Sequence, residues 1–123
     1  MVFLAFGVYV SSTTPQVLSE NEQIVILQYA EPIVDNLLIG INEKDYAKFS
    51  KDFAPGLTIN FDQVTGAWGE YISKGEPSVF RVGDAAKLVY NVRFEKVDRG
   101  VLEIIISDIN GKKLITELSL SES

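Results

Sequence analysis

The spacing of apolar residues changes once along this chain, from a helical period to a strand period. Between Ile24 and Ile41, apolar residues recur every three or four positions, which places them on one face of a helix. After Gly69 they recur at every second position, as in half-buried strands. Helices that precede strands in this way predict an α+β fold, with N-terminal helices packed on a mostly antiparallel sheet.

The first helix is predicted to begin at a capping box. Ser19 and Glu22 have the spacing at which the hydroxyl bonds a free amide and the carboxylate reaches back. Pro32 interrupts the apolar stripe, so a kinked helix and two consecutive helices both fit, and the unbroken stripe favours the kink. Asn42 is predicted to cap a second, short helix, and a third is predicted over residues 60–68.

Four strands are predicted after the helices. The first covers residues 71–82 and is interrupted near Pro77, which confines it to a sheet edge or a bulge because proline donates no ladder hydrogen bond. Three more regular strands are predicted at 86–97, 101–108 and 112–120.

The loops between these strands set which side chains face the helices. Residues 98–100 and 109–111 both fit three-residue loops that end in glycine. A two-residue turn within 109–111 also fits the local chemistry, but it would pair Ile104 with Glu117 and mix polar with apolar residues. The three-residue loop is therefore preferred, and it pairs Ile104 with Thr116.

This register predicts the two faces of the sheet. The inner face is expected to carry Leu88, Tyr90, Val92, Phe94, Leu102, Ile104, Ile106, Leu114, Thr116, Leu118 and Leu120. On the outer face Val89, Ile105 and Ile115 form a small apolar patch, either ordinary surface or part of a contact between sheets. A row of Glu95, Glu103 and Glu117 is interpreted as a solvated charge row and not as a metal site, because calcium needs six to eight oxygens.

Composition limits the kinds of site and partner that this chain can have. The 123 residues carry 11 basic and 17 acidic side chains, a net charge of −6, and contain no cysteine and no histidine. Disulfides, cysteine nucleophiles, thiolate or imidazole metal sites and serine–histidine triads are therefore excluded. The acidic balance disfavours nucleic acid and anionic membranes as partners, and no cofactor is expected.

An apolar run at residues 2–10 opens the chain. It is too short to span a bilayer, which takes about 20 residues of helix. It fits either an extra strand or the remnant of a signal peptide, and residues 11–15 then form a linker. We expect residues 1–18 to form this segment and residues 19–123 to form one domain. An extracytoplasmic location follows from the signal interpretation and a cytoplasmic one from the strand interpretation.

Several stretches resemble one group of proteins. They are the run at 40–53 (GINEKDYAKFSKDF), Trp68-Gly69, the strand that contains Tyr90, and the hairpin at Gly111-Lys112. Together they resemble small bacterial and archaeal domains of unknown function in the nuclear transport factor two-like (cystatin-like) superfamily, over roughly residues 20–120. The resemblance implies a curved sheet wrapped around a long N-terminal helix, forming a cone that can hold a cavity. It also implies a homodimer formed through the outer face of the sheet.

Three functions are compatible with these features. The preferred one is a non-catalytic accessory or binding domain with a filled core, dimerising through Val89, Ile105 and Ile115. The second is a binder of a small hydrophobic ligand inside the cone, lined by Phe61, Trp68, Tyr71, Tyr90 and Thr116.

The third is an isomerase or dehydratase that uses Tyr90 with Asp62. It is the least favoured, because the inner face of the three regular strands carries no carboxylate to act as a base.

Overall fold

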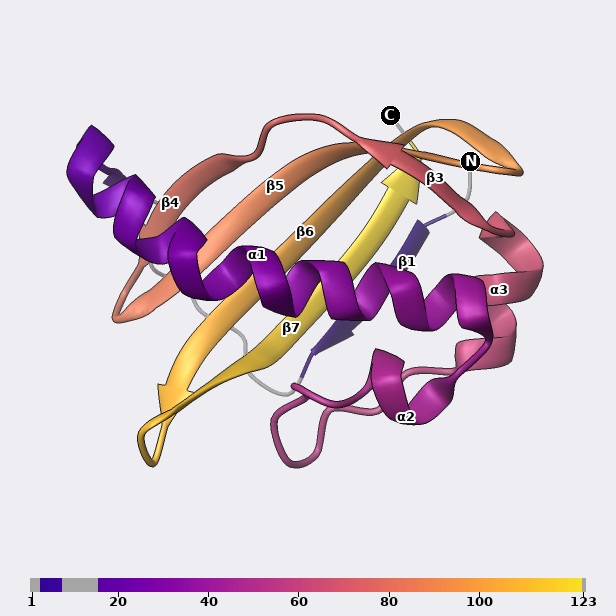
Figure 1. Cartoon of the computed structure of the whole chain (residues 1–123), viewed down its shortest axis with the longest axis horizontal. Coiled ribbons are helices and arrows are strands. Elements are labelled where there is room, and N and C mark those ends of the chain that lie inside the picture. Colours follow the sequence, from indigo (N-terminus) through magenta and orange to yellow (C-terminus); the bar gives the residue numbers. More distant parts are fainter. Residues whose placement is uncertain (1–2, 8–15, 123) are drawn as a thin grey trace.

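The computed structural model describes residues 3–7 and 16–122 as one helical layer on one antiparallel sheet. The helices are α1 (Glu20–Glu43), α2 (Tyr46–Phe49) and α3 (Phe61–Trp68). The strands are β1 (Phe3–Gly7), β2 (Gln16–Val17), β3 (Tyr71–Lys74), β4 (Ser78–Val82), β5 (Ala85–Phe94), β6 (Val97–Ile109) and β7 (Lys112–Glu122). Figure 1 shows α1 lying across one face of the sheet. The predicted α+β class is confirmed.

The sheet contains more strands than the four expected. Its order is β1-β7-β6-β5-β4-β2, and β3 pairs with β5 beside this path. The strand predicted at 71–82 is divided into β3 and β4, on either side of Pro77. β1 pairs with β7 and β2 pairs with β4, so the N-terminal segment contributes a strand at each end of the sheet. The remaining residues of the apolar run and its linker, 2 and 8–15, lie outside the described part of the chain.

α1 begins where the sequence predicts. The backbone N–H of Glu22 donates to the hydroxyl oxygen of Ser19 at 3.3 Å, and that hydroxyl donates to the Glu22 carboxylate at 3.0 Å. The helix continues through Pro32, so one helix forms and not two. It ends at Glu43, and the C-cap residue Lys44 has a left-handed backbone (φ 53°). Asp45, and not Asn42, caps α2, accepting a hydrogen bond from the backbone N–H of Lys48 at 3.1 Å.

The turn between β6 and β7 corrects the predicted register. It has two residues, Asn110 and Gly111, both with positive φ (53° and 84°), as an asparagine–glycine turn of this kind requires. The pairing shifts between Ile105 and Ile106, and beyond this bulge Ile104 pairs with Leu118. The bulge lets the chain keep both the favourable short turn and the apolar pairing, which were treated as alternatives.

The turn between β5 and β6 also differs from the prediction. It lies at residues 95–96, and Gly100, expected in the loop, lies inside β6 opposite Val92. A Cβ atom on Gly100 would come within 2.5 Å of Trp68 Cζ3, so only glycine leaves room for this indole. Glu103 consequently pairs with Val89 and Ser119, and the predicted row of three glutamates does not form.

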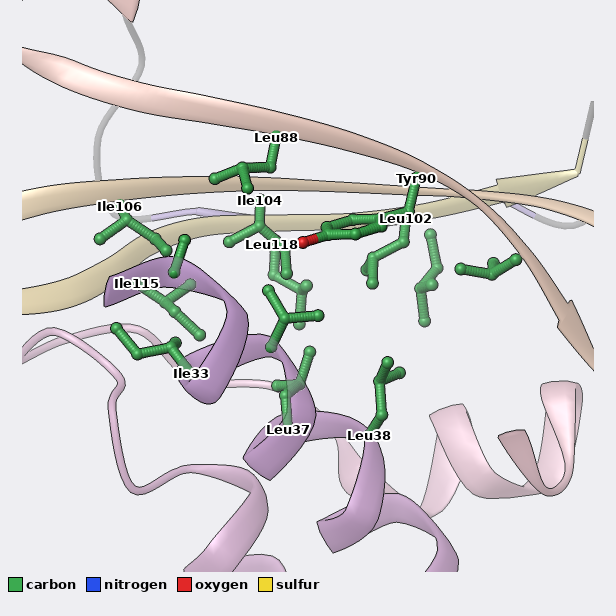
Figure 2. Close-up of a cluster of buried hydrophobic side chains, with 14 of the residues drawn as sticks. Ile33, Leu37, Leu38, Leu88, Tyr90, Leu102, Ile104, Ile106, Ile115 and Leu118 are labelled. Carbon is green, nitrogen blue, oxygen red and sulfur yellow. The ribbon is translucent and has the colours of Figure 1, made fainter. Parts of the chain in front are cut away.

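The core lies between α1 and the sheet. Figure 2 shows Leu37 and Leu38 of α1 facing side chains of β5, β6 and β7, including Ile104. Ile104 is fully buried, as predicted. Ile115 was expected on the outer face but is 1% exposed and belongs to this core, because the bulge reverses the direction of the side chains near it. Leu114, expected inside, is only half-buried.

Candidate functional site

The hydroxyl of Tyr90 is the most unusual polar group of the interior. Tyr90 is fully buried on β5, and its hydroxyl has no hydrogen-bond partner among the described residues. Figure 2 shows its oxygen directed among apolar side chains near Leu118. Burial raises the pKa of Tyr90, and the charges of Glu31 and Asp35 raise it further. The phenol is therefore held in its neutral form.

Lys74, beside this tyrosine, forms a cluster with two carboxylates of α1. Lys74 Nζ lies 5.2 Å from the centre of the Tyr90 ring, 3.2 Å from Glu31 Oε2 and 3.8 Å from Asp35 Oδ1. Burial acts to lower the pKa of Lys74, but the hydrogen bond to Glu31 and the two carboxylate charges outweigh it, and the pKa is raised. Glu31 and Lys74 were not predicted. The spacing of Glu31 and Asp35, one helical turn apart, was the available signal.

The five residues predicted to line an internal pocket separate into different environments. Trp68 and Tyr71 both pack edge-on against Phe94, with ring centres 5.2 Å and 5.7 Å away. Phe61 instead contacts Phe49 of α2, at 4.9 Å between ring centres. Thr116 is buried, and its hydroxyl donates to the backbone oxygen of Ile105 at 3.3 Å. These five, Tyr90 included, line none of the three clefts described below.

Asp62 does not join Tyr90. It is an exposed residue in the first turn of α3, and the Tyr90 hydroxyl makes no hydrogen bond to any described residue. The acid–base pair considered from the sequence is therefore not assembled in this structure.

A cleft of about 380 Å³ lies beside the amino-terminal half of α1. It is lined by Asn21, Glu22, Val25, Ile26, Tyr29, Arg81 and Lys113, and we call it the α1 cleft. A second cavity of about 150 Å³ shares Ile26, Tyr29 and Arg81 with it and extends to Asp84, Ala85 and Ala86 at the start of β5. α1, β4 and β7 each contribute to the α1 cleft, and Figure 1 shows where α1 and β4 run beside each other.

Two ion pairs stand at the α1 cleft. Arg81 Nη2 lies 2.7 Å from Glu22 Oε2, and Lys113 Nζ lies 3.2 Å from Asp108 Oδ2. Lys113 Nζ also lies 4.9 Å from the centre of the Tyr29 ring, so it covers one face of that ring. Burial raises the pKa of Tyr29, while the charges of Lys113 and Arg81 act to lower it. Both cations therefore act on the same phenol.

A third cleft, of about 310 Å³, lies near the carboxyl end of α3. It is lined by Ile41, Lys44, Thr65, Gly69, Glu70, Glu95 and Lys96. Two of its polar side chains already have backbone partners, since Lys96 donates to Gly66 O at 2.7 Å and Glu95 accepts from Glu70 N at 3.3 Å. Within residues 3–7 and 16–122, no group of three or more acidic side chains gathers as a metal site would need.

α1 is long and apolar enough, by length and composition, to cross a membrane. Core helices that cover a sheet pass the same test. Here Val34, Leu37 and Leu38 are buried against the strands, with at most 2% exposure. This packing accounts for the apolar residues on the face of α1 that covers the sheet.

Comparison with known proteins gives no match. No family model matches the chain, and no similar curated protein or solved structure was found.

Proposed function

We propose that this chain is a non-catalytic domain that binds a small, largely apolar molecule in the α1 cleft. The observation that supports this most is the volume of about 380 Å³ between the side chains of Val25, Ile26 and Tyr29 and the charged groups at the rim. Sites for small molecules have volumes of about 300–1,000 Å³, with apolar walls and a few polar groups that orient the ligand. The α1 cleft has this size and this composition.

The environment of Tyr90 supports binding over catalysis. A catalytic base has to come within hydrogen-bond reach of the group whose proton it takes. The Tyr90 hydroxyl is buried and makes no hydrogen bond to a described residue, and Asp62 is exposed on α3. A ligand in the interior would also have to displace part of the core that Leu88, Leu102 and Ile104 fill.

We also propose that the domain belongs to the nuclear transport factor two-like superfamily. The long N-terminal helix packed on an antiparallel sheet supports this. The run at 40–53, which carries the resemblance, has a structural reason, because a Cβ atom on Gly40 would come within 2.5 Å of the backbone nitrogen of buried Phe49. The strands β1 and β2 depart from the expected four-stranded sheet.

Backbone amide NMR tests the proposed binding. We expect decanol, added below its solubility limit, to shift the amide signals of Val25, Ile26 and Tyr29. Val25→Trp fills the α1 cleft and should abolish these shifts. Ile24→Trp is the matched control, because Ile24 and Val25 are both exposed (49% and 58%) but only Val25 lines the α1 cleft. Equal binding by the two variants, or shifts centred on Tyr90, would contradict the proposal.

A further inference from the structure

Two cations line the α1 cleft, Arg81 and Lys113. Each is paired with one carboxylate, Arg81 with Glu22 at 2.7 Å and Lys113 with Asp108 at 3.2 Å. The two cations are the groups of this cleft to which an anion can bind.

Both cations have hydrogen-bond donors to spare. A guanidinium group has five N–H donors, and among the described residues Arg81 makes one side-chain ion-pair contact, from Nη2 to Glu22. The ammonium group of Lys113 has three donors and, within the part of the chain that the structure describes, one carboxylate contact, with Asp108. All four side chains of these pairs are between 41% and 50% exposed, and exposed ion pairs contribute little to stability. A second anion can therefore approach either cation without dismantling the fold.

The two cations come from different strands and line the α1 cleft together with Tyr29. Arg81 lies on β4 and Lys113 on β7, and the charges of both act on the phenol of Tyr29 on α1. Next to this polar group, Val25 and Ile26 provide the apolar wall. A ligand that uses both parts has one anionic end and a hydrocarbon body. A cationic ligand is disfavoured, because Lys113 already covers the ring of Tyr29.

We propose that the α1 cleft selects a free medium-chain carboxylate, with Arg81 and Lys113 binding the carboxylate and Val25, Ile26 and Tyr29 contacting the chain. This inference rests on the proposed function. Glu22 competes with the ligand for Arg81 and so sets its affinity.

Three probes with the same hydrocarbon chain test the selection. Decanoate, decanol and decyltrimethylammonium are titrated below their critical micelle concentrations, and binding is followed by amide shifts and calorimetry. We expect decanoate to bind about tenfold more tightly than decanol, as a charge-assisted hydrogen bond provides. Decyltrimethylammonium should bind most weakly.

Four variants test which charged side chains change the affinity for decanoate. Arg81→Gln and Lys113→Gln should each weaken decanoate binding about tenfold and leave decanol unchanged. Glu22→Gln should strengthen decanoate binding, because it removes the competing carboxylate. Lys87→Gln is the control, since Lys87 lies outside the α1 cleft, 3.9 Å from Glu103.

The outcomes separate this inference from the proposed function. If decanol shifts the α1 cleft signals as strongly as decanoate does, the binding domain stands and the selection for a carboxylate is wrong. Tightest binding of decyltrimethylammonium, or equal losses in Lys87→Gln and Arg81→Gln, also overturns the selection. If none of the three probes shifts these signals, both proposals fail.

Discussion

The ammonium group of Lys74 lies over the ring of Tyr90, with its nitrogen 5.2 Å from the ring centre. The same nitrogen pairs with Glu31, so one lysine of β3 joins α1 to β5. Lys74 and Glu31 are partly exposed, with 20% and 34% of their side chains accessible. The contact therefore lies at the boundary between solvent and the core, of which the Tyr90 ring is a fully buried part.

Removing the Tyr90 hydroxyl should stabilise the protein. A buried hydroxyl without a partner loses its hydrogen bonds to water and gains none, so Tyr90→Phe is expected to raise the free energy of unfolding by about 1 kcal/mol. Urea denaturation measures it. Tyr46→Phe is the control, because Tyr46 is 46% exposed, and it should have no effect. Destabilisation by Tyr90→Phe would mean that the hydroxyl bonds an acceptor such as a buried water.

The ionisation of Tyr90 should make the free energy of unfolding depend on pH in the alkaline range. The pKa of Tyr90 in the folded protein is raised above its ordinary value of 10.0, so the folded state holds this proton more tightly than the unfolded state does. Its contribution to stability is complete below pH 10 and decreases as the pH rises further. Between pH 9 and pH 11 the wild type should lose more unfolding free energy than Tyr90→Phe. Urea denaturation at the two pH values measures these losses. Equal losses of unfolding free energy in the wild type and in Tyr90→Phe would contradict the prediction.

Two glycine substitutions should change stability in opposite directions. Gly100→Ala places a Cβ atom 2.5 Å from the Trp68 ring and should cost about 2 kcal/mol through overpacking. Gly66→Ala lies within α3 with no atom near the new Cβ, and it should stabilise the helix by about 1 kcal/mol. Thermal and urea denaturation of both variants provide the comparison. A neutral Gly100→Ala would show that Trp68 can move away.

The coupling energy between Lys74 and Glu31 should be measurable by a double-mutant cycle. Lys74→Met, Glu31→Gln and the double variant are expected to give a coupling energy of about 0.5–1 kcal/mol, because both groups are partly buried. The pair Arg93–Asp98 is the control. Its side chains are 60% and 86% exposed, and its coupling should be close to zero. Equal coupling in the two cycles would mean that burial gives the first pair no advantage.

Dimerisation through the outer face of the sheet stays a prediction. Of the three residues expected there, Ile115 belongs to the core, Ile105 is 8% exposed and Val89 is half-buried. Val89 is thus the residue left to test. Sedimentation velocity at micromolar concentration should show a dimer that Val89→Lys dissociates. A monomeric wild type would remove the proposed interface.

The sequence predicted those features that depend on neighbours in the chain. The cap at Ser19 is local, and the inward side of Ile104 follows from alternation over several residues. The bulge near Ile105 was not predictable, because Ile104, Ile105 and Ile106 are consecutive apolar residues and do not mark where the side chains change face. The place of Gly100 also depends on a distant group, the indole of Trp68.

The α1 cleft could not be predicted for a similar reason. Tyr29, Arg81 and Lys113 are separated by long stretches of sequence, and each looks like an ordinary surface residue in its own element. Only the packing of α1 against the ends of β4 and β7 brings them together. The interior was predicted more closely, since Tyr90 and Trp68 are both fully buried, but they pack as parts of a filled core.

The two N-terminal strands have a consequence for the integrity of the sheet. β1 covers the open side of β7, and β2 covers part of the open side of β4. Proteolytic loss of the first 17 residues would uncover backbone N–H and C=O groups at both margins at once. Uncovered margins recruit strands from other molecules, so a nick in this short segment would turn a self-contained sheet into a template for aggregation.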